Sequence, residues 1–309
     1  MRLSRRSLLH VLIFLVLGCQ QKTPVYHDVP LAPLNIQNLR QESTMVFDVR
    51  SAEESQRPLL PGAAAMRWDD FLGISPLAMA KLAEKLDVSS EKTILVVGRG
   101  KQGAGEDGYI AWIFDIFGMQ NVYTLSSEFY LNSGFSAIPS AVRKPAGHPE
   151  ADPNLFIEAV DFRAYVTQTL PQRGWTSKAR SRALGGVPLG ALYPPPKSFF
   201  GMKFPELQHK VLVLDVRSQN EFEGYNLKME KAVKAPLLHL SWSEFFDDRG
   251  LPSASVNTRL AELGVHKNSI VFVISERGVR SGAVAYAMRS LGYQKVVNYL
   301  GGYRQWERQ

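Results

Sequence analysis

The chain has the sequence MVFDVRS at residues 45–51 and VLVLDVRS at residues 211–218. Both stretches are short apolar runs that end in Asp-Val-Arg-Ser, and they lie 167 positions apart. A short apolar run that ends in polar residues is typical of a buried strand that leads into a loop. Because the same string occurs in both halves of the chain, it indicates an internal repeat.

The same order of segments follows each string: an apolar run, a glycine-bearing loop, a helix-like segment that stops at a glycine, and another strand. The corresponding segments are 94–97 and 270–274, 108–114 and 282–288, Gly118 and Gly292, and 121–125 and 295–300. Continuous apolar strands that alternate with helices indicate a parallel sheet covered on both faces. The sequence therefore predicts an α/β fold of two domains, each with a central, mostly parallel sheet and helices on both faces.

The composition agrees with two globular domains. The chain has 309 residues, of which 45% are hydrophobic and 21% are charged, and one domain typically takes about 100–200 residues. Between the repeats lie several prolines and a basic stretch with a double glycine, which we interpret as a solvated surface segment; a site for an acidic partner or anionic lipid is the alternative. The predicted divisions are a signal peptide at 1–18, a tether at 19–33, a first domain at 34–139, a linker or insertion at 140–199 and a second domain at 200–309.

These strings resemble the rhodanese domain, and in particular the tandem domains of thiosulfate and mercaptopyruvate sulfurtransferases. The family's Asp-Val-Arg motif matches at Asp48 and Arg50 and again at Asp215 and Arg217. The second half matches in more segments, ending with LGGYRQW at residues 300–306. The resemblance implies two rhodanese-like α/β domains.

The resemblance also implies where the chemistry of this family would occur. In active members a loop has the pattern Cys-x-x-Gly-x-Arg, and its cysteine takes up sulfane sulfur as a persulfide. This pattern aligns Ser275 with the cysteine and Arg280 with the arginine, and Gly98 occupies the corresponding place in the first half. A serine hydroxyl is far less acidic than a thiol, whose pKa is about 8.5, and it cannot hold a persulfide. We therefore predict that the protein is a pseudoenzyme, with no catalytic residue and no cofactor.

A loop of this shape can still hold an anion without covalent chemistry. Backbone N–H groups at a helix start and two arginines would suit sulfate, phosphate or thiosulfate. The alternative is that the arginines face water or pair with Asp215 or Glu276. The predicted anion-binding loop consists of Ser275, Glu276, Arg277, Gly278, Val279, Arg280 and Ser281.

The corresponding loop of the first half contains two overlapping Gly-x-Gly-x-x-Gly strings, at 98–103 and 103–108. A dinucleotide fingerprint needs such a string after the first strand of its domain, with an acid about 20 residues further on. Here the repeat makes the preceding strand a late one, and the nearest acid after the next strand, Glu128, is too distant. A flexible glycine-rich loop is the preferred interpretation. The six histidines are scattered, so no metal site is predicted.

The single cysteine, Cys19, follows a basic head and the apolar stretch 8–18. Eleven residues at 1.5 Å each cannot cross a hydrocarbon core of about 30 Å, so a signal sequence fits better than a spanning helix. Val16-Leu17-Gly18-Cys19 resembles the lipobox of bacterial lipoproteins, which implies lipidation of Cys19. Arg5 and Arg6 are compatible with twin-arginine export as well as with the general route, and Gln20 favours the outer membrane.

Removal of residues 1–18 would leave 33 basic and 29 acidic residues, too mild an excess to indicate nucleic acid. We therefore expect a lipid-anchored, periplasm-facing protein of the bacterial envelope, with two rhodanese-like domains that bind a small anion or an envelope protein partner. The alternative is a sulfurtransferase-related protein that relies on an external thiol.

Overall fold

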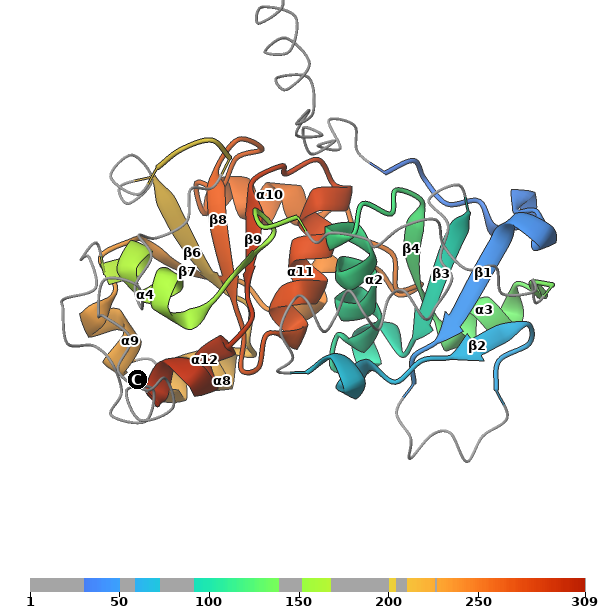
Figure 1. The fold of residues 1–309 in the computed structure, drawn as a ribbon, viewed down its shortest axis with the longest axis horizontal. Helices are drawn as coiled ribbons and strands as arrows, with labels where there is room; N and C mark the ends of the chain where they lie inside the picture. Colours follow the sequence, from blue (N-terminus) through green and yellow to red (C-terminus); the bar gives the residue numbers. More distant parts are fainter. Residues whose placement is uncertain are drawn as a thin grey trace, which may run out of the picture.

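The computed structural model contains two parallel sheets with helices between and around them (Figure 1). The residues whose structure is described are 31–50, 59–72, 92–138, 152–167, 200–203, 210–225 and 227–308. The predicted signal peptide, Cys19 and the basic stretch between the repeats lie outside them. No helix in these ranges is long and apolar enough to cross a membrane.

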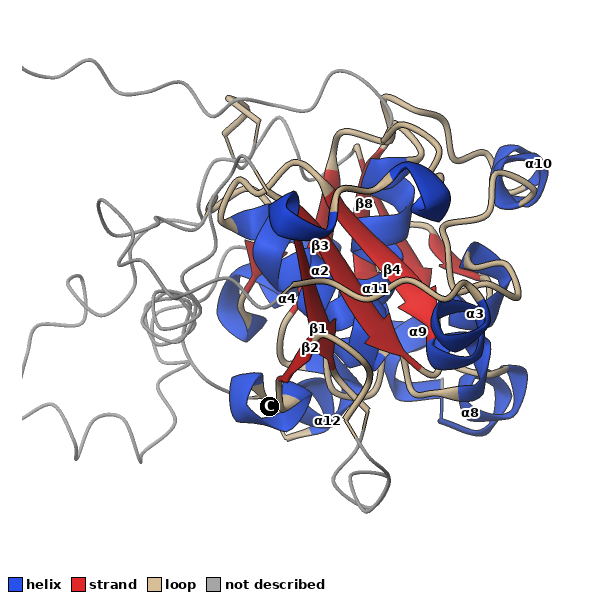
Figure 2. Cartoon of the chain, turned by 90° about the vertical axis from the view of Figure 1, so that its right-hand side faces the viewer, coloured by secondary structure: helices blue, strands red, loops and turns tan. Residues whose placement is uncertain are grey.

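The first sheet has four parallel strands in the order β2-β1-β3-β4. The strands β1, β3 and β4 correspond to the three apolar segments of the first repeat, and Figure 2 shows them side by side. Their bounds are β1 (Thr44–Asp48), β2 (Ala63–Ala65), β3 (Thr93–Gly98) and β4 (Val122–Ser126).

The second sheet has five strands in the order β5-β9-β8-β6-β7, again with parallel pairing throughout. Here β6, β8 and β9 correspond to β1, β3 and β4, so the three central strands recur in the same spatial order. The predicted α/β fold with parallel sheets is confirmed. The bounds are β5 (Phe156–Ile157), β6 (Val211–Asp215), β7 (Leu237–His239), β8 (Ile270–Ile274) and β9 (Val296–Tyr299).

Helices cover the sheets on both faces, as the uninterrupted apolar strands require. Successive side chains of a strand point to opposite faces. In β8, Val271 and Val273 belong to the core between the sheets, whereas Ile270, Phe272 and Ile274 belong to the core on the outer face. The helices are α2 (Glu106–Ile116), α3 (Ser127–Asn132), α4 (Ala159–Thr167), α8 (Gln219–Tyr225), α9 (Leu227–Ala232), α10 (Val256–Glu262), α11 (Val279–Ser290) and α12 (Gly302–Glu307), with short 3-10 turns η1 (Ile36–Asn38), η2 (Gln41–Ser43), η3 (Trp68–Phe71), η4 (Gly100–Gln102) and η5 (Trp242–Phe245).

The two long helices end where the sequence predicts. Gly118 follows the end of α2 with φ +79°, and Gly292 follows the end of α11 with φ +91°. A glycine adopts this left-handed conformation without the steric cost that other residues incur, which is why it closes helices.

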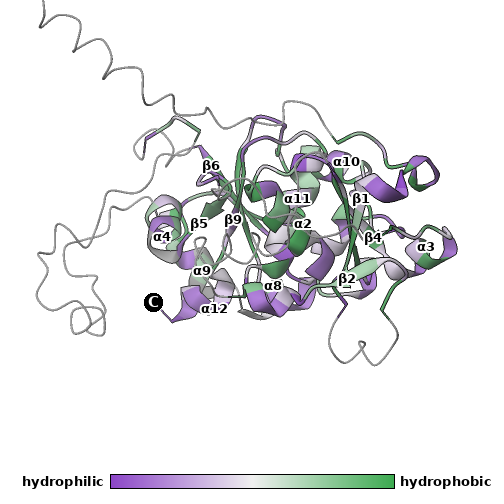
Figure 3. Cartoon of the chain, turned by 45° about the vertical axis from the view of Figure 1, so that its right-hand side comes forward, coloured by the Kyte–Doolittle hydropathy of each residue, from purple (hydrophilic) through white to green (hydrophobic). Residues whose placement is uncertain are grey.

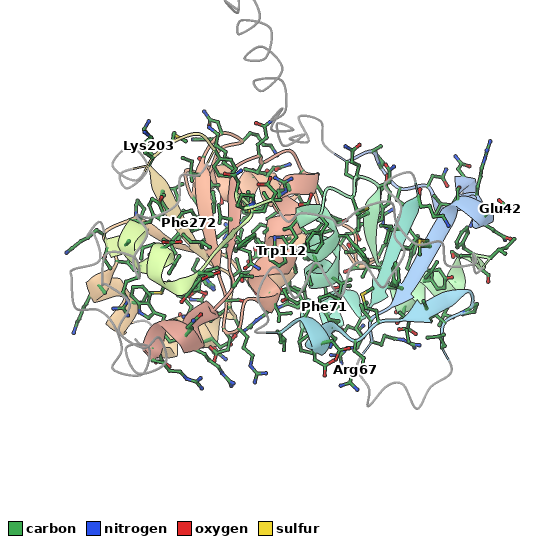
Figure 4. The ribbon with its side chains drawn as sticks, viewed as in Figure 1. Glu42, Arg67, Phe71, Trp112, Lys203 and Phe272 are labelled. Atoms are coloured by element: carbon green, nitrogen blue, oxygen red, sulfur yellow. The ribbon has the colours of Figure 1, made fainter. Side chains whose placement is uncertain are left out.

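The two helices lie side by side between the sheets and join the halves into one core (Figure 1). Trp112 is fully buried in this layer, where Figure 4 labels it, and Figure 3 shows the hydrophobic residues gathered on these helices and the adjacent strands. At the helix starts Gly108 lies against Ala283, and at the ends Arg289 pairs with Asp115. The helices therefore run in the same direction, which places the carboxyl ends of both sheets on one side.

The structure differs from the predicted domain boundaries in one respect. The strand β5 and the helix α4 fall within the stretch 140–199 that we expected to be a linker or insertion, but β5 pairs with β9 and completes the second sheet. A strand of two residues is too short to show periodicity, so it left no sequence signal. The second sheet therefore draws on residues well before position 200.

Candidate functional site

The two loops predicted from the repeat lie at the carboxyl ends of equivalent strands. The 275–281 loop connects β8 to α11, and the loop at 98–108 connects β3 to α2. Ligands of parallel sheets bind preferentially at this edge. Both loops therefore occupy the position where a functional site is expected.

In the 275–281 loop the side chain at the family's cysteine position is held inside the protein. Ser275 is 1% exposed, and its Oγ accepts a hydrogen bond from the Ser281 backbone N–H at 3.1 Å. The Ser281 hydroxyl donates to Asn298 Oδ1 at 2.6 Å, so the Ser275 hydroxyl donates to Ser281 Oγ at 3.0 Å. Ser275 thus satisfies a backbone donor in the first turn of α11, a group that would otherwise be available to an anion.

Asn298 completes this network and was not among the predicted site residues. Its Nδ2 donates to the Gly278 carbonyl at 3.1 Å, which ties the middle of the loop to β9. The loop turns at Gly278 with φ +86°, where a Cβ atom would lie 2.4 Å from the Leu300 carbonyl oxygen. In the sequence, Asn298 could have been noticed because it is the one polar amide within the otherwise apolar run VVNYL at residues 296–300.

The guanidinium predicted to bind an anion instead binds a carboxylate of the protein. Arg280 donates from Nη1 and Nη2 to the two oxygens of Glu221 on α8, each at 2.6 Å. The expected partners, Asp215 or Glu276, are therefore wrong for this arginine. The hydrogen bond from Arg280, with those from Ser218, lowers the pKa of Glu221 to about 2.

The other charged residues of the loop differ in their surroundings. Glu276 accepts a hydrogen bond from Arg304 of α12 at 2.9 Å, while Arg277 is exposed to solvent. Backbone N–H groups of Tyr303 and Arg304 donate to the carbonyls of Ser275 and Glu276, so the start of α12 packs directly on the loop. Val279 is buried.

The repeated Asp-Val-Arg motif forms the same local structure in both halves. Arg217 Nη2 donates to Asp215 at 2.7 Å, and Arg50 Nη2 donates to Asp48 at 2.7 Å. Both members of the Asp215 pair are fully buried, and the guanidinium lies 4.1 Å from the centre of the Tyr303 ring. These pairs anchor the ends of β1 and β6 beside the two loops.

The 98–108 loop has no room for a side chain at the family's cysteine position. A Cβ atom at Gly98 would lie 2.8 Å from the Cβ of Asp107, whose side chain occupies that space. The Asp107 carboxylate accepts hydrogen bonds from the backbone N–H groups of Gly100 at 3.1 Å and Gly108 at 2.9 Å. Burial, together with the adjacent charge of Glu106, raises the pKa of Asp107 to about 7.

Glu106 accepts two further donors of this loop. It is 2% exposed and accepts hydrogen bonds from the Ala104 backbone N–H at 2.6 Å and from Arg99 Nε at 3.2 Å. The glycine-rich strings therefore direct backbone donors toward carboxylates of the chain itself. This arrangement gives the dinucleotide alternative no support.

In each loop, internal side chains thus accept part of the donors that an anion would use: Ser275 and Glu221 in the 275–281 loop, and Asp107 and Glu106 in the 98–108 loop. Within the described ranges, no three His, Cys, Asp or Glu side chains are grouped as metal ligands would be.

Residues 204–309 match the family model described as a rhodanese-like domain, so the second half of the chain contains such a domain. Several solved structures share the fold at low sequence identity. SseA from Escherichia coli, described as a 3-mercaptopyruvate sulfotransferase, aligns with a TM-score of 0.54 and 15% identity over 84% of this chain and 93% of its own.

Two further structures are similar over most of this chain. YnjE aligns with a TM-score of 0.53 and 15% identity over 86% of this chain and 61% of its own. A variant of EanB in complex with ergothioneine aligns with a TM-score of 0.59 and 14% identity over 89% of this chain and 65% of its own. The chain therefore spans less than two thirds of either protein. A search of curated proteins gave no match.

Proposed function

We propose that the chain is a pair of rhodanese-like domains that acts as a non-catalytic binding or scaffold module in the bacterial envelope. The observation that carries this proposal is that neither loop offers a thiol at the position that the resemblance gives to the cysteine: Ser275 stands there in one half and Gly98 in the other. The Ser275 hydroxyl is buried and accepts the Ser281 N–H of α11 in one loop, and Asp107 occupies the space beside Gly98 in the other. A thiol is needed to hold a persulfide, and the only thiol in the sequence is Cys19.

The recurrence of the three central strands and of the Asp-Arg pair supports a second rhodanese-like domain in the first half. The lipobox-like sequence before Cys19 supports anchoring by a lipid, export to the periplasmic face and, with Gln20, the outer membrane. Two or more acyl chains would give stable attachment, whereas one would not. Labelling with an acyl precursor tests this part: the wild type should incorporate it and Cys19→Ala should not.

The competing function is sulfur handling with an external thiol. It is favoured by the fold shared with SseA and EanB, one of whose structures is described as ergothioneine linked to a persulfide of a cysteine. In this scheme the protein would position thiosulfate while a separate dithiol accepts the sulfur.

One assay separates the two functions. Purified protein is mixed with thiosulfate and cyanide, with and without an added dithiol, and thiocyanate and sulfite are measured beside a protein-free control. We expect no turnover above that control in either condition. Turnover by the wild type without a dithiol would refute the non-catalytic proposal, and turnover only with the dithiol would establish the competing function. A Ser275→Cys variant reports whether a thiol at this position can become a persulfide.

A further inference from the structure

Lysines lie at the amino end of four of the five strands of the second sheet and of β3 in the first sheet. One lysine precedes the first residue of each of β3, β6, β7, β8 and β9 by one to three positions. Since parallel strands begin at the same edge of a sheet, these residues share one side of the molecule. We call them the lysine edge: Lys92, Lys210, Lys234, Lys267 and Lys295.

The amino ends of both sheets lie on one side of the molecule, so Lys92 of the first half shares that side with the four lysines of the second. The helices α2 and α11 run in the same direction, so the amino ends of both sheets face the same way. In Figure 4 the side chain of Lys203 projects from this side, and the exposed Arg40 precedes β1 there. The result is a row of cations along one side of the protein.

The opposite edge has a different electrostatic character. Several of its arginines form ion pairs with neighbouring carboxylates, including Arg217 with Asp215 and Arg280 with Glu221, whereas Arg277 is exposed. On the lysine edge the hydrogen bonds of Lys267 go to neutral oxygens of Asn257 and Leu291, which leave its charge uncompensated. Four acidic residues among the described ranges lie on that side. Two of them form ion pairs, Asp115 with Arg289 and Glu262 with Arg259, and the other two are Glu42 and Asp152.

The chain enters the described structure on the same side. The backbone N–H of Leu31 donates to the carbonyl of Ser290 at 3.0 Å, at the last residue of α11 and thus beside the lysine edge. Eleven residues separate Cys19 from Leu31. At about 3.3–3.6 Å per extended residue they could span at most about 40 Å.

We propose that the lysine edge lies against the anionic phospholipid headgroups of the membrane in which the chain is anchored. Lysines within a Debye length of such a surface are attracted to it, and salt weakens the attraction. The proposal rests on the proposed function only for the anchor that brings this edge near the bilayer. Its consequence is that the 275–281 loop faces away from the membrane and toward soluble partners.

The test measures which edge approaches the lipid. The full acylated chain is reconstituted into vesicles of phosphatidylcholine alone or mixed with phosphatidylglycerol, with headgroup-quencher lipids present. A fluorophore is placed by Asn268→Cys on the lysine edge or by Asn220→Cys on α8 at the other edge, both exposed positions. Acylation of Cys19 leaves each new thiol as the only one to label.

We expect phosphatidylglycerol to increase quenching of the label at 268 by about two-fold, with little change at 220, and high salt to remove the increase. Lys210→Gln/Lys234→Gln/Lys295→Gln should abolish it. The control Lys101→Gln/Arg304→Gln/Arg308→Gln removes the same charge from the opposite edge and should leave it intact. Thermal unfolding of each variant checks that the fold is retained.

The proposed contact between the lysine edge and the lipid would be refuted if both labels were quenched equally. It would also be refuted if both triple variants lost the phosphatidylglycerol-dependent increase in quenching to the same extent. Mass spectrometry of Cys19 separates the two proposals. If Cys19 is unmodified, the label is placed in a Cys19→Ala background, and quenching at 268 by added phosphatidylglycerol vesicles would then mean that only the anchor fails. If Cys19 is acylated and the lipid composition has no effect, only the lysine edge fails.

Discussion

The guanidinium of Arg280 and the carboxylate of Glu221 form two parallel hydrogen bonds of 2.6 Å. This geometry is the one in which arginine binds a carboxylate or an oxyanion most strongly. Because Glu221 is a fixed part of α8, it competes with any free anion for the same donors. The sequence predicted an anion at this arginine; the structure places an internal carboxylate there.

The ion pair between Arg280 and Glu221 predicts how sulfate affects the melting temperature of the protein. We expect sulfate to leave the melting temperature of the wild type unchanged, because Arg280 already has a partner. Glu221→Gln should release the guanidinium and produce a sulfate-dependent rise in melting temperature, measured by differential scanning fluorimetry. Glu221→Gln/Arg280→Gln should lose that rise. An equal rise in the wild type would show that the 275–281 loop binds anions beside Glu221.

Asp107 predicts a pH dependence of stability. Its pKa in the folded protein, about 7, lies above the ordinary value of 3.8 because the carboxylate is buried beside Glu106. A raised carboxyl pKa favours the folded state when the group is protonated, so this contribution is fully present below about pH 4 and is lost as the pH rises to about 7.

The free energy of unfolding of Asp107→Asn should therefore increase relative to that of the wild type between pH 4 and pH 7, the interval between the two pKa values, and stay level above it. Urea unfolding over this range measures the difference. The exposed Asp70→Asn provides the matched control and should show no such trend. A difference independent of pH would mean that Asp107 is ionised throughout.

At the scale of elements, the contact between α2 and α11 depends on small residues. A Cβ atom at Gly108 would lie 2.5 Å from the Cβ of Ala283, and one at Gly282 would lie 2.7 Å from the Tyr109 ring. Such distances are shorter than any van der Waals contact, so the two helices could not approach this closely with larger residues. The glycines of the repeat thus serve packing as well as the loop turns.

Gly108→Ala should lower the free energy of unfolding by about 1–3 kcal/mol, the usual cost of overpacking a core. Gly224→Ala, in α8 with no neighbouring atom within 4 Å, should be neutral or stabilising. Gly108→Ala/Ala283→Gly should recover part of the loss, since it removes the clashing methyl group. Denaturant titration measures all three. The recovery should be partial, because the added methyl group would still lie 2.8 Å from the Ala283 Cα and 3.1 Å from the Phe246 ring, and no recovery at all would contradict the clash with the Ala283 methyl group.

At the scale of the whole molecule, the halves share one core. The apolar cluster between the sheets contains Phe47 and Trp112 from the first half and Val273 and Tyr286 from the second. Tyr286 also donates a hydrogen bond to the Val122 carbonyl at 2.9 Å, 164 positions away. Neither half could bury these surfaces alone.

We therefore expect both halves to unfold in one cooperative transition. Differential scanning calorimetry should give a single peak whose calorimetric and van't Hoff enthalpies agree. Arg289→Ala, which leaves the partly buried Asp115 without this ion pair at the contact between the halves, should lower the melting temperature without splitting the peak. Two separate peaks in the wild type would contradict a shared core.

The sequence by itself determined the repeated strands, the long helices and their closing glycines at 118 and 292. These features are local: each depends on the periodicity of neighbouring residues or on the conformational freedom of one glycine. The strand β5 escaped prediction because two residues have no period.

Only the tertiary structure decided what fills the loops. Glu221 reaches Arg280 across 59 positions, and Asn298 reaches Ser281 across 17. Such pairings depend on how α8 and β9 pack against the loop, which no spacing in the sequence encodes. The same holds for the lysine edge, because lysines scattered from position 92 to position 295 become one surface only when parallel strands align their amino ends.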